Sequence, residues 1–235
     1  MNSTFESGTS AAGTRSHNWL SAGAIVTRFA ALIFTVAVGA GLAGCSFLKP
    51  AEATARYYVL RPLPTTAPGP VASNSLAVGL GQVKLPAYLF NTSLAVSKGT
   101  NEIDYLPSAL WAERLDTGFQ RVLAADLAIV LPTEQVRVSA WQSEDVAAEV
   151  RVTVEQFDVD ASGQGVLIAQ WRILSPGGEK ILKTGGSRLS RNGPSPGTSP
   201  SGAVATLSEL VADLSRQLAQ ALRETMSGKA APVSK

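Results

Sequence analysis

The sequence predicts a single α+β domain in which a mainly antiparallel sheet is packed by two amphipathic helices, at about residues 108–128 and 203–226. Two observations predict this class. Several short segments rich in β-branched and aromatic residues alternate apolar and polar side chains, as strands do. Two longer segments instead repeat their apolar residues at three- and four-residue steps, as helices with one buried face do. Residues 56–226 are therefore expected to form one folded unit.

An uncharged apolar segment precedes the chain's only cysteine, Cys45. Arg15 and Arg28 lie before this segment, as in the positively charged part of a signal peptide. The segment is shorter than the roughly 20 apolar residues that a spanning helix needs, so cleavage is the preferred interpretation. An uncleaved N-terminal anchor helix stays open as the alternative.

The four residues Leu42-Ala43-Gly44-Cys45 resemble a bacterial lipobox. In that motif a signal peptidase cuts before the cysteine, whose sulfur carries a diacylglyceryl group. We therefore predict that residues 1–44 are a removed signal peptide, and that Cys45 carries diacylglyceryl and N-acyl lipid. No other cofactor is expected. Three acyl chains would make release from a membrane negligible, because each buried CH2 contributes about 0.8 kcal/mol.

Ser46, rather than Asp, follows the cysteine. By resemblance to enterobacterial sorting rules, an Asp at this position would favour retention in the inner membrane. The expected location is thus the periplasmic face of the outer membrane. The inner membrane stays open, since the rule varies between bacteria.

The mature chain would hold about 190 residues, enough for one domain of ordinary size with a real core. Removal of Arg15, Arg28 and Glu6 leaves 18 basic and 17 acidic side chains. Because this balance is nearly even and the basic residues form no run, no nucleic-acid partner is expected.

Most common hydrolytic chemistries are excluded by composition. The only histidine, His17, lies in the signal peptide, and lipid would occupy the sulfur of Cys45. No Ser-His-Asp triad, Cys-His pair, His/Cys zinc site or internal disulfide can then form. The acidic residues are scattered singly and are interpreted as solvated surface. We therefore expect no enzyme and no metal site, with a carboxylate-dependent periplasmic hydrolase as the least favoured alternative.

The first half of the mature chain is predicted to be a short tether followed by strands. Residues 45–55 are the tether, and the proline- and glycine-rich residues 65–75 are a loop. The segments at 91–98 and 102–105 should pair as a hairpin around Gly99-Thr100-Asn101. Strands are expected at about residues 56–60, 76–83, 91–98 and 102–105.

Pro107-Ser108 predicts the start of the first helix, with Ser108 as the N-cap. Core packing is the preferred interpretation of the aromatic residues on its apolar stripe. Ligand stacking by Trp111 and Phe119 is the alternative. The stripe consists of Trp111, Leu115, Phe119, Val122, Leu123 and Leu127.

Strands are expected next at about 135–139, 149–154, 166–174 and 179–189. Val150, Val152 and Val154 alternate with polar residues, but the following apolar residues, Phe157 and Val159, have the opposite parity. A period-two pattern changes face only through an extra residue, which predicts a β-bulge near Glu155-Gln156. The segment 166–174 is nearly all apolar and is expected to be a central strand covered on both faces.

The C-terminal part is predicted to be a mobile surface loop at residues 191–202, an amphipathic helix at about 203–226 and a flexible tail at 227–235. Packing on the sheet is the preferred role of the helix, and a coiled-coil partner helix is the alternative. Its apolar positions are Leu207, Val211, Leu214, Leu218 and Leu222.

The chain resembles the PqiC-like auxiliary lipoproteins of ABC-type transport systems over nearly all of its mature length. Trp111-Ala112-Glu113-Arg114-Leu115 is the most specific part of this resemblance. The other segments that carry it are Tyr57-Tyr58-Val59-Leu60, residues 78–89 from Val78 to Leu89, Phe157-Asp158 and the strand around Trp171.

The resemblance implies a lipid-anchored component that works with an ABC ATPase, a permease and a periplasmic MCE-domain protein. Such systems are thought to move phospholipids or other hydrophobic molecules between the two membranes. The chain would not be the motor of such a system, because it has no phosphate-binding Gly-x-x-x-x-Gly-Lys-Ser/Thr loop. The role that the resemblance implies for it is docking and anchoring. Direct lipid binding in a sheet-helix groove is the alternative, and homo-oligomerisation is left open. The loops at 84–91 and 191–202 are the candidate contact surfaces.

Overall fold

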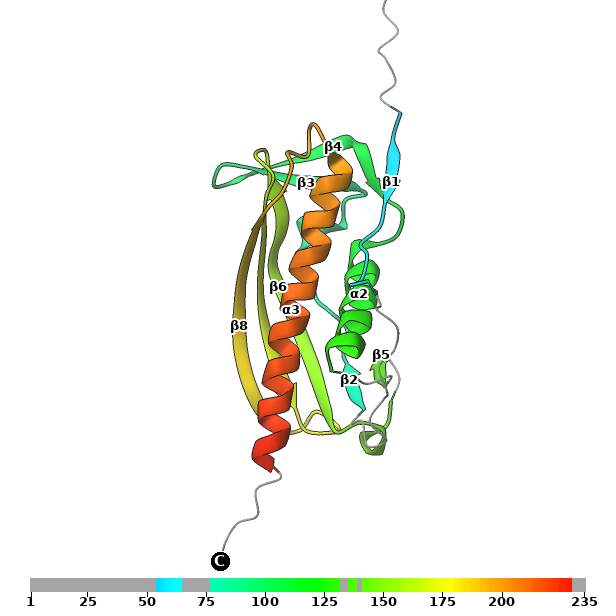
Figure 1. The fold of residues 1–235 in the computed structure, drawn as a ribbon, viewed down its shortest axis with the longest axis vertical. Coiled ribbons are helices and arrows are strands. Elements are labelled where there is room, and N and C mark those ends of the chain that lie inside the picture. The colour runs from blue at the N-terminus through cyan, green and yellow to red at the C-terminus, as the bar shows by residue number, and fades with distance from the viewer. Residues whose placement is uncertain (1–53, 65–76, 132–134, 139–140, 230–235) are drawn as a thin grey trace, which may run out of the picture. The chain divides into compact units, whose positions relative to one another are not determined.

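The computed structural model describes residues 54–64, 77–131, 135–138 and 141–229. The predicted signal peptide, Leu42, Ala43, Gly44, Cys45 and the predicted loop at 65–75 lie outside these residues. In the described part, eight strands form one sheet, and two long helices pack against it (Figure 1). The strands are β1 (Arg56–Tyr58), β2 (Val78–Leu80), β3 (Ser93–Lys98), β4 (Glu102–Trp111), β5 (Val136–Val138), β6 (Ala148–Asp160), β7 (Gln164–Leu174) and β8 (Ile181–Asn192). The helices are α2 (Leu115–Val130) and α3 (Pro200–Lys229), with short 3-10 turns η2 (Ala87–Phe90) and η3 (Ser143–Asp145).

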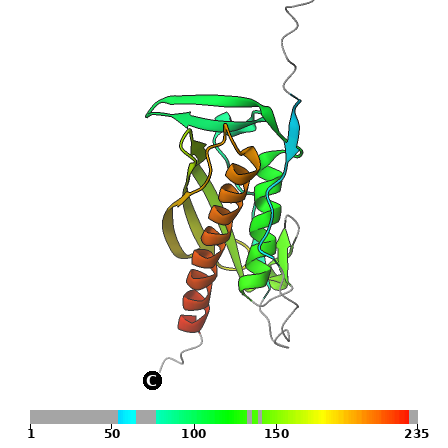
Figure 2. The same cartoon turned by 45° about the horizontal axis from the view of Figure 1, so that its top comes forward.

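Strand β6 is the branching point of the sheet. One edge of β6 pairs with β2 at residues 148–150 and with β3 at residues 159–160, whereas its other edge pairs with β7. Strand β8 extends the sheet beyond β7, and β1 extends it beyond β4. The β3–β4 hairpin lies across one end of the long strands (Figure 2).

The sheet is mixed, so the prediction of a mainly antiparallel sheet is wrong although the α+β class is confirmed. Among the described strands, β1–β4, β2–β5, β2–β6 and β3–β6 pair in parallel, and β3–β4, β6–β7 and β7–β8 are antiparallel. Parallel pairs need long connections, which join strands far apart in sequence. Alternation of side chains within one segment does not report such pairings.

The predicted β-bulge is confirmed. The register between β6 and β7 shifts between Val154 and Gln156, so Phe157 and Val159 are buried on the same side as the preceding valines. The prediction that the strand around Trp171 is covered on both faces is wrong. Strand β7 alternates buried and exposed positions, with Gln170 and Arg172 in solvent.

The first helix begins later than predicted, because β4 continues through Trp111. The N–H of Trp111 donates to the carbonyl of Thr92 at 2.8 Å, and the N–H of Ala112 donates to the carbonyl of Tyr58 at 2.9 Å. These bonds keep the backbone extended, so Ser108 lies in a strand and caps no helix. Helix α2 starts at Leu115 and has no side-chain N-cap.

The second helix is confirmed and is longer than predicted. Strand β8 runs to Asn192 and α3 starts at Pro200, so the intervening loop is shorter than the expected 191–202. Helix α3 also continues through Lys229, into the predicted tail. Its predicted apolar stripe is buried against β6, β7, β8 and α2, which confirms packing on the sheet.

Strand and helix side chains meet in one hydrophobic core. Phe119 of α2 and Phe157 of β6 are fully buried and contact edge to face, with ring centroids 5.1 Å apart. None of the helices in the described residues is long and apolar enough to cross a membrane.

Candidate functional site: the strap groove

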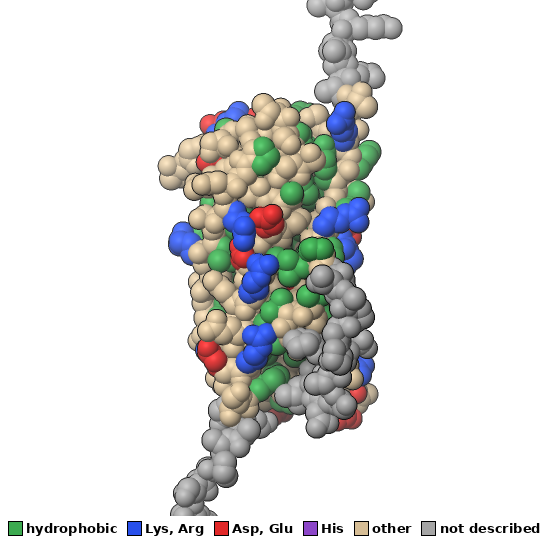
Figure 3. Space-filling model, in the orientation of Figure 1, with side chains coloured by type: hydrophobic (Ala, Val, Ile, Leu, Met, Phe, Trp, Pro, Cys, Tyr) green, Lys and Arg blue, Asp and Glu red, His purple; other side chains and the backbone are tan. Residues whose placement is uncertain are grey.

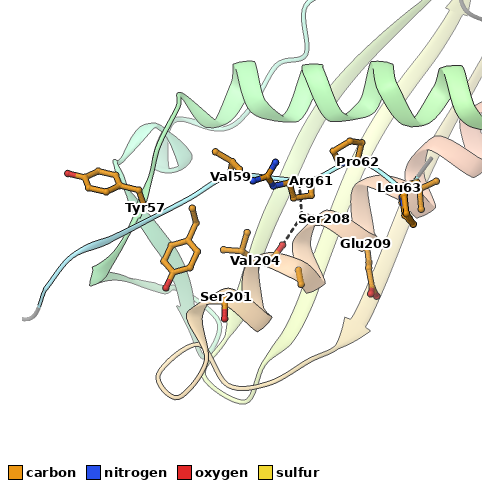
Figure 4. Close-up of a pocket in the computed structure, with 13 residues that line it drawn as sticks. Tyr57, Val59, Arg61, Pro62, Leu63, Ser201, Val204, Ser208 and Glu209 are labelled. Carbon is orange, nitrogen blue, oxygen red and sulfur yellow. Dashed lines mark hydrogen bonds between the residues drawn. The ribbon is translucent and has the colours of Figure 1, made fainter. Parts of the chain in front are cut away.

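An extended segment, residues 59–64, follows β1 and is named the strap here. It passes between α2 and α3, where Figure 4 shows it beside both helices. The strap has no strand partner in the described part of the chain, so other groups must satisfy its backbone.

Side chains from both helices bind the strap backbone. Arg121 of α2 donates from Nη2 to the carbonyl of Leu60 at 3.1 Å. Ser208 of α3 accepts at Oγ from the N–H of Arg61 at 3.1 Å, the bond drawn in Figure 4. The N–H of Leu63 donates to Oδ1 of Asp126, on α2, at 2.7 Å. Together with the buried side chain of Leu60, these bonds fix the path of the strap.

Asp126 is a buried carboxylate at the centre of this arrangement. Its side chain is fully buried, and its Oδ2 atom has no hydrogen-bond partner in the part of the chain that the structure describes. Burial raises the pKa of Asp126 to about 6, against the opposing effects of the Leu63 N–H and the charge of Arg216. The carboxyl group therefore changes its protonation at mildly acidic pH.

A groove with a volume of about 400 Å³ lies between the strap and the first turns of α3 (Figure 4). Its wall is mostly apolar, with Ser201, Ser208 and Glu209 among the polar residues. On the face of the molecule drawn in Figure 3, hydrophobic side chains are visible mainly on the right half. The apolar residues that line the groove are Tyr57, Tyr58, Val59, Pro62, Leu63, Pro64, Val204, Ala205 and Ala212.

Two polar side chains of this groove, Ser208 and Glu209, already have partners within the chain. Ser208 is engaged with the backbone, since it accepts from Arg61 and donates to the carbonyl of Val204 at 2.9 Å. Glu209 is paired with Arg191 at 2.9 Å. No group of three or more His, Cys, Asp or Glu side chains that could hold a metal ion occurs in the described residues. An apolar chain or an apolar protein side chain is what the wall would accommodate.

The aromatic residues singled out from sequence have separate places. Phe119 is buried in the core, which confirms the preferred interpretation of core packing over ligand stacking for this residue. Trp111 is half-buried in β4 and lines a pocket of about 280 Å³ that also contains Phe90 and Arg114. The guanidinium carbon of Arg114 lies 5.6 Å from the centre of the exposed Phe90 ring.

Residues within the two candidate contact segments bind other parts of the domain. In the first, the hydroxyl of Tyr88 donates to Asp158 at 2.8 Å and accepts from the N–H of Phe157 at 3.2 Å. Burial raises the pKa of the Tyr88 phenol above its usual range. In the second, Arg191 is still part of β8 and pairs with Asp213 at 2.6 Å. Lys84 and Phe90 remain exposed in the first loop.

Sequence reasoning missed the residues that hold the strap. Asp126 carried a usable signal, because it lies seven residues after Phe119, on the apolar stripe of α2. A carboxylate on such a stripe is rarely buried without a partner. Ser208 likewise lies between the buried residues Leu207 and Leu210. Neither position indicates which segment it would bind.

The sequence profile of the family described as the ABC-type transport auxiliary lipoprotein component matches residues 58–219, which include the strap, all residues of the groove except Tyr57, and nearly the whole sheet. The chain belongs to this family. The resemblance noted from sequence is thereby confirmed. This is a transport auxiliary family and not an enzyme family, and its members are lipoproteins of the cell envelope that associate with a transport system.

Solved structures share the fold at low sequence identity. A crystal structure of an uncharacterized protein has a TM-score of 0.60 and 21% identity, covering 72% of this chain and 99% of that chain. Protein XCC0632 from Xanthomonas campestris has a TM-score of 0.61 and 12% identity, covering 75% of this chain and 99% of that chain. No curated protein sequence matches the chain.

Proposed function

We propose that this auxiliary lipoprotein anchors and docks an MCE-type transport system at the periplasmic face of the outer membrane. Its partners would be a periplasmic MCE-domain protein, a permease and an ABC ATPase. The system would move phospholipid or another hydrophobic substrate between the two membranes. Lipid on Cys45 would hold the domain at the membrane, and the domain would supply the contact surface.

The strap is the observation that carries this proposal. The chain from Cys45 to Arg56 can span at most roughly 40 Å, because an extended chain covers about 3.6 Å per residue. The strap follows β1, which starts at Arg56, and is bound by Arg121, Asp126 and Ser208. Force applied to the lipid anchor would therefore be transmitted through β1 and the strap to α2 and α3. An anchoring subunit needs such a connection between its anchor and its folded domain.

Cross-linking in intact cells tests the partnership. The tagged lipoprotein is expressed with the ATPase, permease and MCE-domain protein, cross-linked, extracted in detergent and purified. The MCE-domain protein should be enriched relative to a parallel purification of an unrelated tagged outer-membrane lipoprotein. Equal recovery with both baits would overturn the proposed docking role.

Direct lipid binding is a second candidate, favoured by the apolar groove beside the strap. Its volume of about 400 Å³ would hold part of an acyl chain along Tyr58, Val59 and Val204. Native mass spectrometry of the purified domain would show bound lipid that Val204→Glu removes. A wild-type domain that is free of lipid would exclude the carrier role and leave docking in place.

A further inference from the structure

The face of the sheet turned away from α3 carries a group of three cations, of which only one is paired with a carboxylate in the described residues. Arg151 of β6 lies directly opposite Arg172 of β7, and both side chains are exposed. Lys84 lies beside Thr153 through a parallel bridge, and Gln170 is opposite Thr153 on the other edge. Three neighbouring segments of the chain thus bring two guanidinium groups and one ammonium group to the same face.

These groups line one pocket of about 290 Å³. Every polar side chain on its wall can donate hydrogen bonds. The glycine opposite Gln170, Gly186, adds no side chain to this part of the sheet. The polar residues of the wall are Gln82, Lys84, Arg151, Thr153, Gln170 and Arg172.

The cations of the pocket are only partly neutralised. Arg151 donates from Nε to Oε1 of Glu149 at 2.6 Å, and Glu149 is nearly buried beside it. Lys84 and Arg172 form no ion pair within the described residues. The pocket therefore keeps a net charge of about +2. Arg151 and Arg172 lie directly opposite each other, and like charges in such positions destabilise a sheet.

On the neighbouring strand β8, by contrast, the cations that face α3 are paired with carboxylates of that helix. There Lys183 of β8 pairs with Glu224 of α3 at 2.5 Å. Arg191 of β8 pairs with both Asp213 and Glu209. Within the described residues the chain thus supplies carboxylates for the cations of β8 that face α3, but for only one of the three cations of the outer pocket. Lys84 and Arg172 are therefore available to an anion from another molecule.

Arg151 is already positioned for such a ligand. Its guanidinium is fixed by Glu149 and by the turn between β7 and β8, where a Cβ on Gly178 would lie 2.6 Å from Nη2. Arginine and lysine together suit a phosphate group, since guanidinium supplies two parallel donors and ammonium supplies a point charge.

We propose that this outer-face pocket binds a phosphate group through Lys84, Arg151 and Arg172. The group can be free phosphate or the phosphate of a lipid headgroup, because both present the same oxygens. This site lies on the opposite side of the sheet from α3 and the strap groove, and it is independent of the docking role proposed above.

Isothermal titration of the purified lipidated protein in non-ionic detergent at low salt tests the site. Inorganic phosphate and dihexanoyl phosphatidylglycerol are titrated separately. The double variant Lys84→Gln/Arg172→Gln should bind at least about tenfold more weakly, because two charged donors are lost. The matched control Arg56→Gln/Arg137→Gln removes the same charge from exposed positions outside the pocket and should bind within about twofold of wild type.

The two ligands distinguish the sources. Tighter binding of the lipid assigns the pocket to a headgroup, and equal or tighter binding of inorganic phosphate assigns it to free phosphate. Affinity should fall as salt rises, since the exposed charges are screened. The proposal is overturned if neither ligand binds the wild-type protein, or if both double variants bind alike. Equal unfolding temperatures of the variants would show that the substitutions leave the fold intact.

Discussion

The buried carboxylate of Asp126 accepts a 2.7 Å hydrogen bond from the backbone N–H of Leu63. These residues are far apart in sequence, and their bond fixes the strap to α2. Together with Arg121, Ser208 and the buried side chain of Leu60, this contact joins the strap, the first described segment after β1, to the two helices and the hydrophobic core. Its strength and its dependence on pH are both measurable.

Loss of the hydrogen-bond acceptor at position 126 should lower the stability of the protein more than loss of the negative charge there. Asp126→Asn keeps an oxygen that can accept from Leu63, whereas Asp126→Ala leaves this N–H without a partner. Urea unfolding should show Asp126→Ala less stable than Asp126→Asn by about 1–3 kcal/mol. As a surface control, Glu224→Gln, which affects an exposed ion pair with Lys183, should change stability by less than about 1 kcal/mol. Equal stabilities of the two Asp126 variants would mean that the bond contributes little.

The raised pKa of Asp126 gives the stability a specific pH dependence. In the folded protein this carboxyl titrates near pH 6, but in the unfolded chain it titrates near its ordinary value of about 3.9. Between these values the folded state binds more protons, so stability falls as pH rises from about 4 to about 6 and is then level. Carboxyls with a lowered pKa, such as Asp213, act oppositely and at lower pH.

Comparison with Asp126→Asn isolates this effect from the other carboxyls. The free energy of unfolding of wild type minus that of the variant should decrease between pH 4 and pH 6, because only wild type has the titrating group. Chemical denaturation at half-unit pH intervals measures it. A difference that stays constant over this range would show that Asp126 is not titrating there.

Two adjacent glycines in β8 should respond differently to alanine. The ring of Trp171 lies over Gly185, where a Cβ would approach within 2.2 Å of Cζ2. Gly185→Ala must therefore displace Trp171 from its 3.0 Å hydrogen bond with Ser187, at a cost of about 1–3 kcal/mol. At Gly186 the nearest atom is the flexible amide oxygen of Gln170, at 3.1 Å.

Gly186→Ala is the matched control for this prediction, since it alters the neighbouring residue in the same strand. It should shift the unfolding midpoint much less and leave the near-ultraviolet circular dichroism unchanged. Gly185→Ala should change that spectrum by moving the indole ring. If the two substitutions changed the unfolding midpoint and the spectrum alike, close contact with the Trp171 ring would not be the reason why residue 185 has to be glycine.

Sequence patterns predicted those features of the fold that depend on residues close together in the sequence. The parity change between Val154 and Phe157 predicted the bulge, because one extra residue is the only way to keep both on the buried face. The spacing of Leu207, Val211 and Leu214 likewise predicted a helix packed on the sheet. Both conclusions use only period and burial.

Structure that depends on distant segments was not predictable in this way. Ser108 looks like a helix cap, but the neighbouring Ala109 pairs with Arg56 of β1, and the strand continues. The parallel pairing of β2 with β6 also escapes any local pattern. The strap contacts depend on Asp126 and Ser208 meeting a segment that no periodicity connects to them.

Replacement of Cys45 tests the central claim most directly. Two unlipidated forms are expressed in a strain that lacks the native protein: Cys45→Ala, and residues 46–235 behind an ordinary cleavable signal peptide. Circular dichroism should show a folded domain in the second form, which should leave the membrane fraction, and neither form should restore transport. Full restoration of transport by the soluble, folded form would contradict the account, because position at the membrane would then not be what this lipoprotein contributes.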